Sequence, residues 1–234
     1  MPAEDQTKKM QTDEPTETTS RGRAPAQSLR DMAFEAIKRR IITCDLRPGE
    51  VLSEAVLSDT LNIGRTPVRQ AIDRLMTSGL VDVLPRKGVM VKPITLDEIF
   101  DIIEVRLINE SHCARRAATQ ADESEIARMA ANVNAMWSAA ESADVDTMMD
   151  LDHAFHAIIS GASRNAVVAE ILGNLHDRST RLWFISLRAV EQHVRVCEQH
   201  AAIVDGIRRR DPDAAEAAIR EHIESFRDNL TRQI

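Results

Sequence analysis

Four side chains in the second half of the chain have the types and spacing of a metal-binding set. Asp152 and His156 stand four residues apart, so an α-helix would place them on one face, where both can bind the same ion. His200 and His222 follow at distances that require two further helices. Three imidazoles and a carboxylate suit zinc first, with nickel, manganese or iron as alternatives, and a six-coordinate ion would keep positions for water or a ligand.

The alternative is that these histidines are ordinary packed or solvated residues, since the chain contains seven. His153 is the neighbour of Asp152 but points about 100° away around a helix, so the two side chains cannot easily face one ion. His176 lies in a later helical stretch and could line the same cavity, although its spacing does not require that. The spacing alone leaves a metal site and chance placement both open.

A second set, at residues 64–75, has the pattern of a helix that reads DNA. Gly64 ends a turn, Thr66 can cap the free N–H groups of a helix start, and Pro67 suits the first helical position. Apolar residues recur at helical spacing and predict a buried face: Val68, Ala71, Ile72 and Leu75. Polar residues remain near the exposed start of the helix: Arg65, Arg69 and Gln70. Arginine is suited to bidentate contact with guanine, and a recognition helix enters the major groove by its first turns.

The flanking segments supply the rest of a small winged domain. Residues 52–61 predict a short amphipathic helix, joined to the next by the turn at residues 62–64, and Gly79 ends the second helix. Strands at 80–84 and 89–91 flank a basic tip made of Pro85, Arg86, Lys87 and Gly88. A helix over about 28–44 would complete the core with Met32, Ile37, Ile41 and Ile42. Helix-turn-helix geometry also occurs without DNA, but the combination of turn, helix, hairpin and basic tip favours DNA binding.

Length and composition predict two mainly helical domains and a tail. Residues 1–27 have almost no apolar content and are expected to be a disordered tail, followed by a winged helix-turn-helix domain at 28–93. From Thr95 onward helical periodicity is interrupted near five places: 121–122, 143–144, 163–165, 187–188 and 211–213. Five interruptions separate six helices, and the short connections predict an antiparallel six-helix bundle at 94–234.

The charge is divided unevenly along the chain. The net charge of −7 comprises −1 in residues 1–27, +3 in 28–93 and −9 in 94–234, so only the winged segment is basic, as a phosphate-facing module should be. No apolar run of 18 residues exists, and no apolar core follows the first charges. Three scattered cysteines, expected to be buried small residues or a redox sensor, form no close pair: Cys44, Cys113 and Cys197. A cytoplasmic protein without membrane contact is expected.

Several arginines raise the question of a bound anion. Arg106 stands among apolar residues that should face inward, and a buried arginine needs an anion. That anion is either Glu110, four residues on, or the carboxylate of a bound effector. Asn174, Arg178 and Arg181 share one face of a later helix and are weaker candidates for polar contacts, since the pattern favours ordinary surface positions for Arg178 and Arg181.

Taken together, these motifs resemble the GntR family of bacterial transcription regulators, in the FadR-like branch that carries an FCD ligand-binding domain. The resemblance rests on the recognition-helix pattern from Arg65 to Leu75, on Gly88 at the wing tip and on motifs around the bundle residues: 106–110, 151–156, 198–203 and 221–223. Six bundle helices rather than seven look more like the VanR-type subgroup. By this resemblance Asp152, His156, His200 and His222 would bind a divalent metal, and a small carboxylate effector would lie above it.

We therefore expect a dimeric, ligand-responsive repressor that binds an imperfectly palindromic operator, not an enzyme. Arg65 and Arg69 would read bases, Thr66 would hold a phosphate, and the wing tip would approach the minor groove. One alternative is a metal-dependent hydrolase with Glu198 as general base. Another is a regulator for which the ion itself is the signal.

Overall fold

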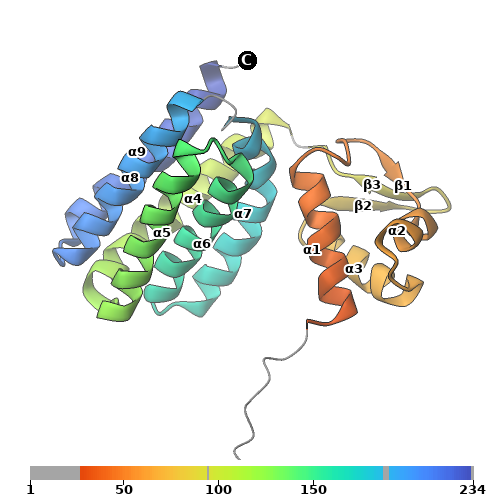
Figure 1. Cartoon of the computed structure of the whole chain (residues 1–234), viewed down its shortest axis with the longest axis horizontal. Coiled ribbons are helices and arrows are strands. Elements are labelled where there is room, and N and C mark those ends of the chain that lie inside the picture. Colours follow the sequence, from red (N-terminus) through yellow and green to blue (C-terminus); the bar gives the residue numbers. More distant parts are fainter. Residues whose placement is uncertain (1–26, 94, 187–189, 233–234) are drawn as a thin grey trace, which may run out of the picture.

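The computed structural model describes residues 27–93, 95–186 and 190–232, which form two domains (Figure 1). The amino-terminal domain contains three helices and three strands: α1 Leu29–Ile42, β1 Val51–Leu52, α2 Glu54–Leu61, α3 Arg65–Thr77, β2 Val81–Leu84 and β3 Gly88–Val91. The expected winged helix-turn-helix is confirmed. The tail predicted at residues 1–27 lies outside the described residues, except for its last residue.

The wing is part of a three-stranded antiparallel sheet in the order β1-β3-β2. The hairpin of β2 and β3 matches the sequence prediction, whereas β1 has only two residues and is too short to leave a pattern. Gly88 opens β3 with φ +115, and a Cβ there would lie 2.5 Å from the carbonyl oxygen of Leu52. Only glycine fits this conformation and this close approach of β1.

Two details of this domain differ from the sequence prediction. Helix α3 begins at Arg65 with Gly64 as its N-cap, so the capping role predicted for Thr66 is wrong. Pro67 lies within the first turn, where backbone N–H groups have no partner in the helix, so its missing N–H is tolerated there as well. The buried face of α3 is confirmed: Val68, Ala71, Ile72 and Leu75.

The predicted core of α1 needs correction at both ends. Met32 is 45% exposed because it lies outside the stripe formed by Ala33, Phe34, Ile37 and Ile41. Ile42 is buried, but it belongs to the hydrophobic cluster of the second domain rather than to that of the first. The last turn of α1 is therefore anchored in the neighbouring domain.

The second domain is a bundle of six helices in the described residues: α4 Leu96–Gln120, α5 Glu123–Glu141, α6 Val145–Ala162, α7 Ala166–Ser186, α8 Val190–Arg208 and α9 Pro212–Arg232. Four of the five predicted interruptions coincide with helix ends, and the one at 187–188 lies outside the described residues. Side chains of Thr95, Asp122 and Asp144 accept hydrogen bonds from backbone N–H groups and fix three helix starts.

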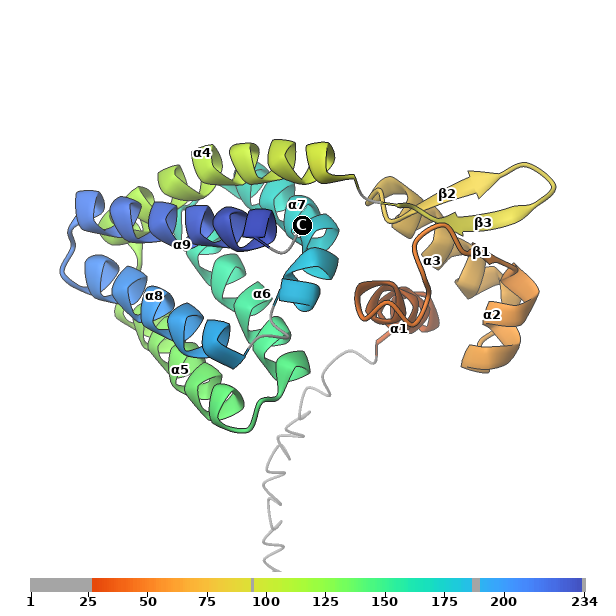
Figure 2. The same cartoon turned by 90° about the horizontal axis from the view of Figure 1, so that it is seen from above.

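Neighbouring helices of the bundle enclose one apolar core. Helix α9 lies beside α4 and α8, α5 lies beside α6, and α7 is on the side nearest α1 (Figure 2). Three helices that carry the candidate ligands, α6, α8 and α9, thus surround a common interior. Among the described residues, no helix combines the length and the apolar character that crossing a membrane requires.

Candidate metal centre and DNA-binding surface

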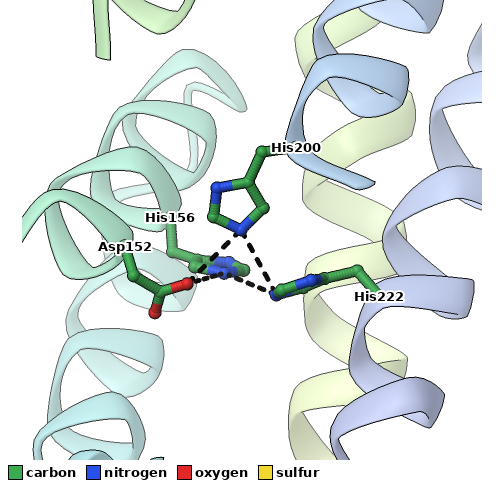
Figure 3. A group of neighbouring side chains, drawn as sticks. All are labelled: Asp152, His156, His200 and His222. Carbon is green, nitrogen blue, oxygen red and sulfur yellow. Dashed lines mark hydrogen bonds and ion pairs between the residues drawn. The ribbon is translucent and has the colours of Figure 1, made fainter. Parts of the chain in front are cut away.

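The four candidate ligands meet inside the bundle. Asp152 and His156 extend from α6, His200 from α8 and His222 from α9, and their ligand atoms lie within 4.8 Å of one another (Figure 3). All four side chains are buried, and His200 is completely inaccessible. The fold brings together residues up to 70 positions apart, so the convergence is a property of the tertiary structure.

The spacing of these atoms fits a small divalent ion. Nε2 of His222 lies 3.3 Å from Nε2 of His156 and 3.4 Å from Nε2 of His200. Oδ1 of Asp152 lies 3.3 Å from Nε2 of His200 and 3.7 Å from Nε2 of His156. A tetrahedral ion with bonds of about 2.0–2.1 Å holds neighbouring ligand atoms roughly 3.3–3.4 Å apart. The donor set suits such an ion, and these four separations lie in or near that range.

The Nδ1 atom of each imidazole faces a group that can accept a hydrogen bond, which favours the tautomer with the proton on Nδ1. His156 Nδ1 lies 2.5 Å from Oε2 of Glu110, and His222 Nδ1 lies 3.2 Å from Oε1 of Gln199. His200 Nδ1 faces the thioether sulfur of Met136 at 3.1 Å. With a proton on each Nδ1, three Nε2 lone pairs point at one another, an arrangement that a cation between them stabilises.

Electrostatics favour the forms of these groups that bind metals. Burial lowers the pKa of His200, and it holds the pKa of His222 well below its ordinary value, so both imidazoles are neutral near pH 7. Burial alone would raise the pKa of Asp152, but His156, His176 and His200 hold it well below its usual range. Neutral imidazoles and an ionised carboxylate are the forms that bind a metal.

Several supporting residues had no assigned role at the sequence level. Gln199 and Met136 hold ligands in orientation, yet neither shows a distinctive spacing. Glu110 was expected only as a partner of Arg106, and it is also the acceptor for His156. His176 of α7, considered as a lining residue, lies with Nε2 3.3 Å from Oδ2 of Asp152, and burial lowers its pKa to about 4.

Arg106 is buried, and Glu110 is the anion that the structure places beside it. Its Nε donates to Oε1 of Glu110 at 2.6 Å, which is the structural pair. Burial would raise the pKa of Glu110, but Arg106 and His156 hold it well below its usual range. Arg106 also lines a small cavity of about 10 Å³ beside the cluster, together with Asp152, His222, Ile223 and Phe226. Its position therefore permits contact with an anion near the cluster.

The other candidate effector residues lie elsewhere. Asn174 is exposed, Arg178 forms an ion pair with Glu98, and neither lines a cavity next to the cluster. Arg181 is buried and donates to the carbonyl oxygen of Lys92 at 3.1 Å, so a surface position for it is wrong. The fold turns this face of α7 toward the winged domain, which helix periodicity alone does not reveal.

The candidate DNA-binding residues form an exposed surface on the winged domain. Arg65, Thr66, Arg69 and Gln70 are all exposed at the start of α3, and Arg86 and Lys87 are exposed at the wing tip beside the half-buried Gly88. Arg69 donates through Nε and Nη2 to Oε2 of Glu54, at 3.1 and 2.9 Å. The Arg69 side chain remains 67% exposed despite this contact.

Comparisons with known proteins give matches to both domains. Residues 29–91 match the family described as bacterial regulatory proteins, gntR family, and residues 101–225 match the FCD domain. The chain is 28% identical over 210 residues to the HTH-type transcriptional repressor RspR of Escherichia coli, covering 90% of this chain and 92% of that protein. It is 26% identical over 223 residues to the Glc operon transcriptional activator of Escherichia coli, covering 86% and 88% respectively.

The fold also matches solved structures. The structure of E. coli McbR/YncC aligns with a TM-score of 0.80 at 19% identity, covering 88% of this chain and 99% of that one. At this identity the likeness concerns the fold alone. The hydrolase alternative is wrong, since the matched families are regulators and Glu198, its required base, is exposed on α8.

Proposed function

Because the chain belongs to the gntR family of bacterial regulatory proteins, in the branch with an FCD domain, we propose that it is a repressor controlled by a ligand of its helical domain. It is a DNA-binding transcription regulator and not an enzyme. The observation that carries the proposal is the convergence of three Nε2 atoms and one carboxylate inside the matched FCD domain. The six described bundle helices support the VanR-type subgroup.

We place the DNA interface on α3 and the wing. Arg65 and Arg69 would read base edges in the major groove with Gln70 beside them, while Thr66 would hold a phosphate. Arg86, Lys87 and Gly88 would approach the minor groove. One winged domain makes few contacts, so a homodimer on an imperfectly palindromic operator in the cytoplasm is the proposed functional form.

We propose that Asp152, His156, His200 and His222 hold a divalent ion, zinc being the first choice. Such an ion, when bound, would supply a Lewis acid for an oxygen of a small carboxylate effector. Arg106 would donate N–H groups to the same carboxylate, while Glu110 keeps both Arg106 and His156 in place. Asn174 and Arg178 remain predicted effector contacts that would need a rearranged bundle.

One observation favours the second candidate function, in which the ion itself is the signal. The two cavities next to the cluster measure about 10 and 40 Å³. The smaller is close to the minimum for a single water. A metabolite would have to open the bundle, whereas an ion needs no more room than the ligand atoms already provide.

Two measurements on the full chain test the proposal. Selection from a random duplex pool should recover two half-sites related by a dyad, and a pool without enrichment would contradict DNA reading. Thermal melts with zinc and a panel of small carboxylic acids should show a stabilising acid, worth about 2.7 kcal/mol at a hundred times its Kd.

The acid response should disappear in His200→Ala and persist in His112→Ala, which alters an exposed histidine of α4. If zinc alone shifts the melt and alters operator affinity while no acid does, the ion is the signal. If neither zinc nor any acid shifts the melt, the proposed ligand control is wrong.

A further inference from the structure

Helix α1 of the winged domain is tied to the bundle by charged pairs. Lys38 forms an ion pair with Asp177 of α7. Arg39 binds Asp150 and Asp146 of α6, at 2.6 and 3.2 Å. These contacts supplement the apolar anchor of Ile42 and connect α1 to two helices of the bundle.

The two sets of pairs differ in burial. The Lys38 and Asp177 side chains are only 14% and 13% exposed, whereas Arg39 and Asp150 are 38% and 65% exposed. Exposed ion pairs contribute little because water screens them, while breaking a buried pair leaves an uncompensated charge. Of the charged contacts, the one with α7 is therefore the one expected to contribute most to the position of α1.

Helix α7 holds the winged domain at a second place. Arg178 forms its ion pair with Glu98 at the start of α4, and its Cδ packs 3.4 Å from the position of a Cβ on Gly79, just after α3. Arg181 donates to the carbonyl oxygen of Lys92 in the connection between the domains. One helix thus contacts α1, the end of the recognition helix and the connection.

Helix α7 also reaches the cluster, through His176, the residue that precedes Asp177 and Arg178. His176 lies 3.3 Å from Oδ2 of Asp152, whose Oδ1 faces His200 within the cluster. His153 contacts both residues of α7. Its ring centroid lies 4.7 Å from that of His176, and its Nδ1 lies 3.8 Å from Oδ1 of Asp177. Consecutive residues of α7 therefore contact a candidate ligand and the DNA-binding domain.

The interface around these contacts borders an open pocket. A cavity of about 440 Å³ lies between α1, α6 and α7, lined among others by Lys38, Ile42, Met149 and Thr180. Close-packed interfaces resist displacement, whereas this one has space on one side of its ion pairs. This space leaves room for a small shift of α7 against α1, while Ile42 stays packed in the core of the bundle.

We propose that α7 transmits the occupancy of the cluster to the DNA-binding domain, through His176 on one side and Asp177 and Arg178 on the other. The proposal rests on the proposed function of the cluster as a metal site. An ion that fixes Asp152 fixes its contact with His176, and the next two residues then hold α1 and the end of α3 in one arrangement. The winged domain would therefore take one position when the cluster holds an ion and another when the cluster is empty.

Amide hydrogen exchange of the full chain, with zinc and after chelation, tests this inference. Zinc should slow exchange in α1 at least about fivefold, the lower end of typical coupling between sites. In Asp177→Asn the slowing in α1 should fall below about twofold, while α8 and α9 still respond. Lys38→Met, which removes the other partner of this ion pair, should lose the slowing in α1 to the same extent.

Two controls belong to the experiment. Asp150→Asn breaks an exposed pair with α1 and should keep the wild-type response, and α2, which lies away from the bundle, should not respond in any variant. The proposal would be overturned if zinc still slowed exchange in α1 of both Asp177→Asn and Lys38→Met. It would also be overturned if Asp150→Asn abolished this slowing as fully as they do. Absence of zinc binding would overturn the proposed function and the coupling with it, whereas bound zinc without an α1 response would overturn the coupling alone.

Discussion

The two domains place their functional residues in opposite ways. On the winged domain the candidate DNA contacts are exposed and lie within two short segments, at Arg65–Gln70 and at Arg86–Gly88. In the bundle the candidate ligands are buried and come from three helices. A surface that recognises DNA can be built from local structure, whereas an ion site that excludes water depends on the packing of the whole bundle. The variants described next therefore each change a property of their own domain directly, which is zinc binding for the bundle and base recognition for the winged domain.

The largest effect is expected from removing a ligand. His200→Ala deletes a fully buried imidazole, so zinc bound per chain should fall to none and the stabilisation by zinc, about 4 kcal/mol at a thousand times its Kd, should disappear. Metal analysis and thermal melts measure both, with His112→Ala as the control. Zinc retained by the variant at full occupancy would contradict the assignment.

A smaller loss is expected from Glu110→Gln, which touches no ion. The amide cannot accept from both His156 and Arg106 as the carboxylate does, so zinc affinity should fall about 10- to 100-fold, as for other partners of metal-bound histidines. Competition with a chromogenic chelator measures this on the folded protein. The control is Glu104→Gln, which changes an exposed residue of the same helix and should bind zinc like the wild type. If Glu110→Gln also binds zinc as tightly as the wild type, Glu110 does not support the site.

The reverse pattern is expected on the winged domain. Arg69→Ala should cost about 1–3 kcal/mol on specific DNA and relax the preference at one base position, with zinc binding unchanged. Arg69→Lys keeps the charge but loses the planar fork, so it should lose the base preference and keep the salt dependence of binding. Titrations of the selected operator and of variants at each position check this. If both variants keep the wild-type preference at every base position, Arg69 does not contact the bases.

The smallest expected effect is a pH dependence confined to the bundle, because residues 28–93 contain no histidine. Burial lowers the pKa of His176 to about 4, while the unfolded chain binds this proton near pH 6.5. Between these values the unfolded state holds more protons, so stability of the metal-free protein falls as pH falls. From pH 7 to pH 6 this histidine should account for less than about 1 kcal/mol.

Urea unfolding of chelated protein at the two pH values measures this dependence. His176→Gln should reduce it, since glutamine cannot take up the proton. The same free energy of unfolding at both pH values in the wild type would contradict the burial argument.

The same contrast explains how far the sequence could be interpreted. The turn, the buried stripe of α3 and the wing follow from local spacing, and so do the helix ends at Thr95 and Asp122. The i, i+4 pair of Asp152 and His156 marked one half of the cluster. Nothing local indicates that Gln199 faces His222 or that Met136 faces His200, because these contacts depend on how the helices pack.

The errors have the same origin. Periodicity predicts a core position for Met32 and a surface position for Arg181, because it gives the faces of a helix without showing what covers them. Ile42 continues the apolar pattern of α1, yet it is buried against the second domain. Contacts between domains are invisible to a pattern found within one helix.

The central claim is that the cluster inside the bundle controls DNA binding by the winged domain. Its most direct test is the Kd of the full chain for its selected operator, measured with one equivalent of zinc and after chelation, for the wild type and for His200→Ala. We expect at least about a fivefold difference in the wild type and none in the variant. The same Kd for the wild type with and without zinc, at confirmed occupancy, would contradict control of operator binding by the ion.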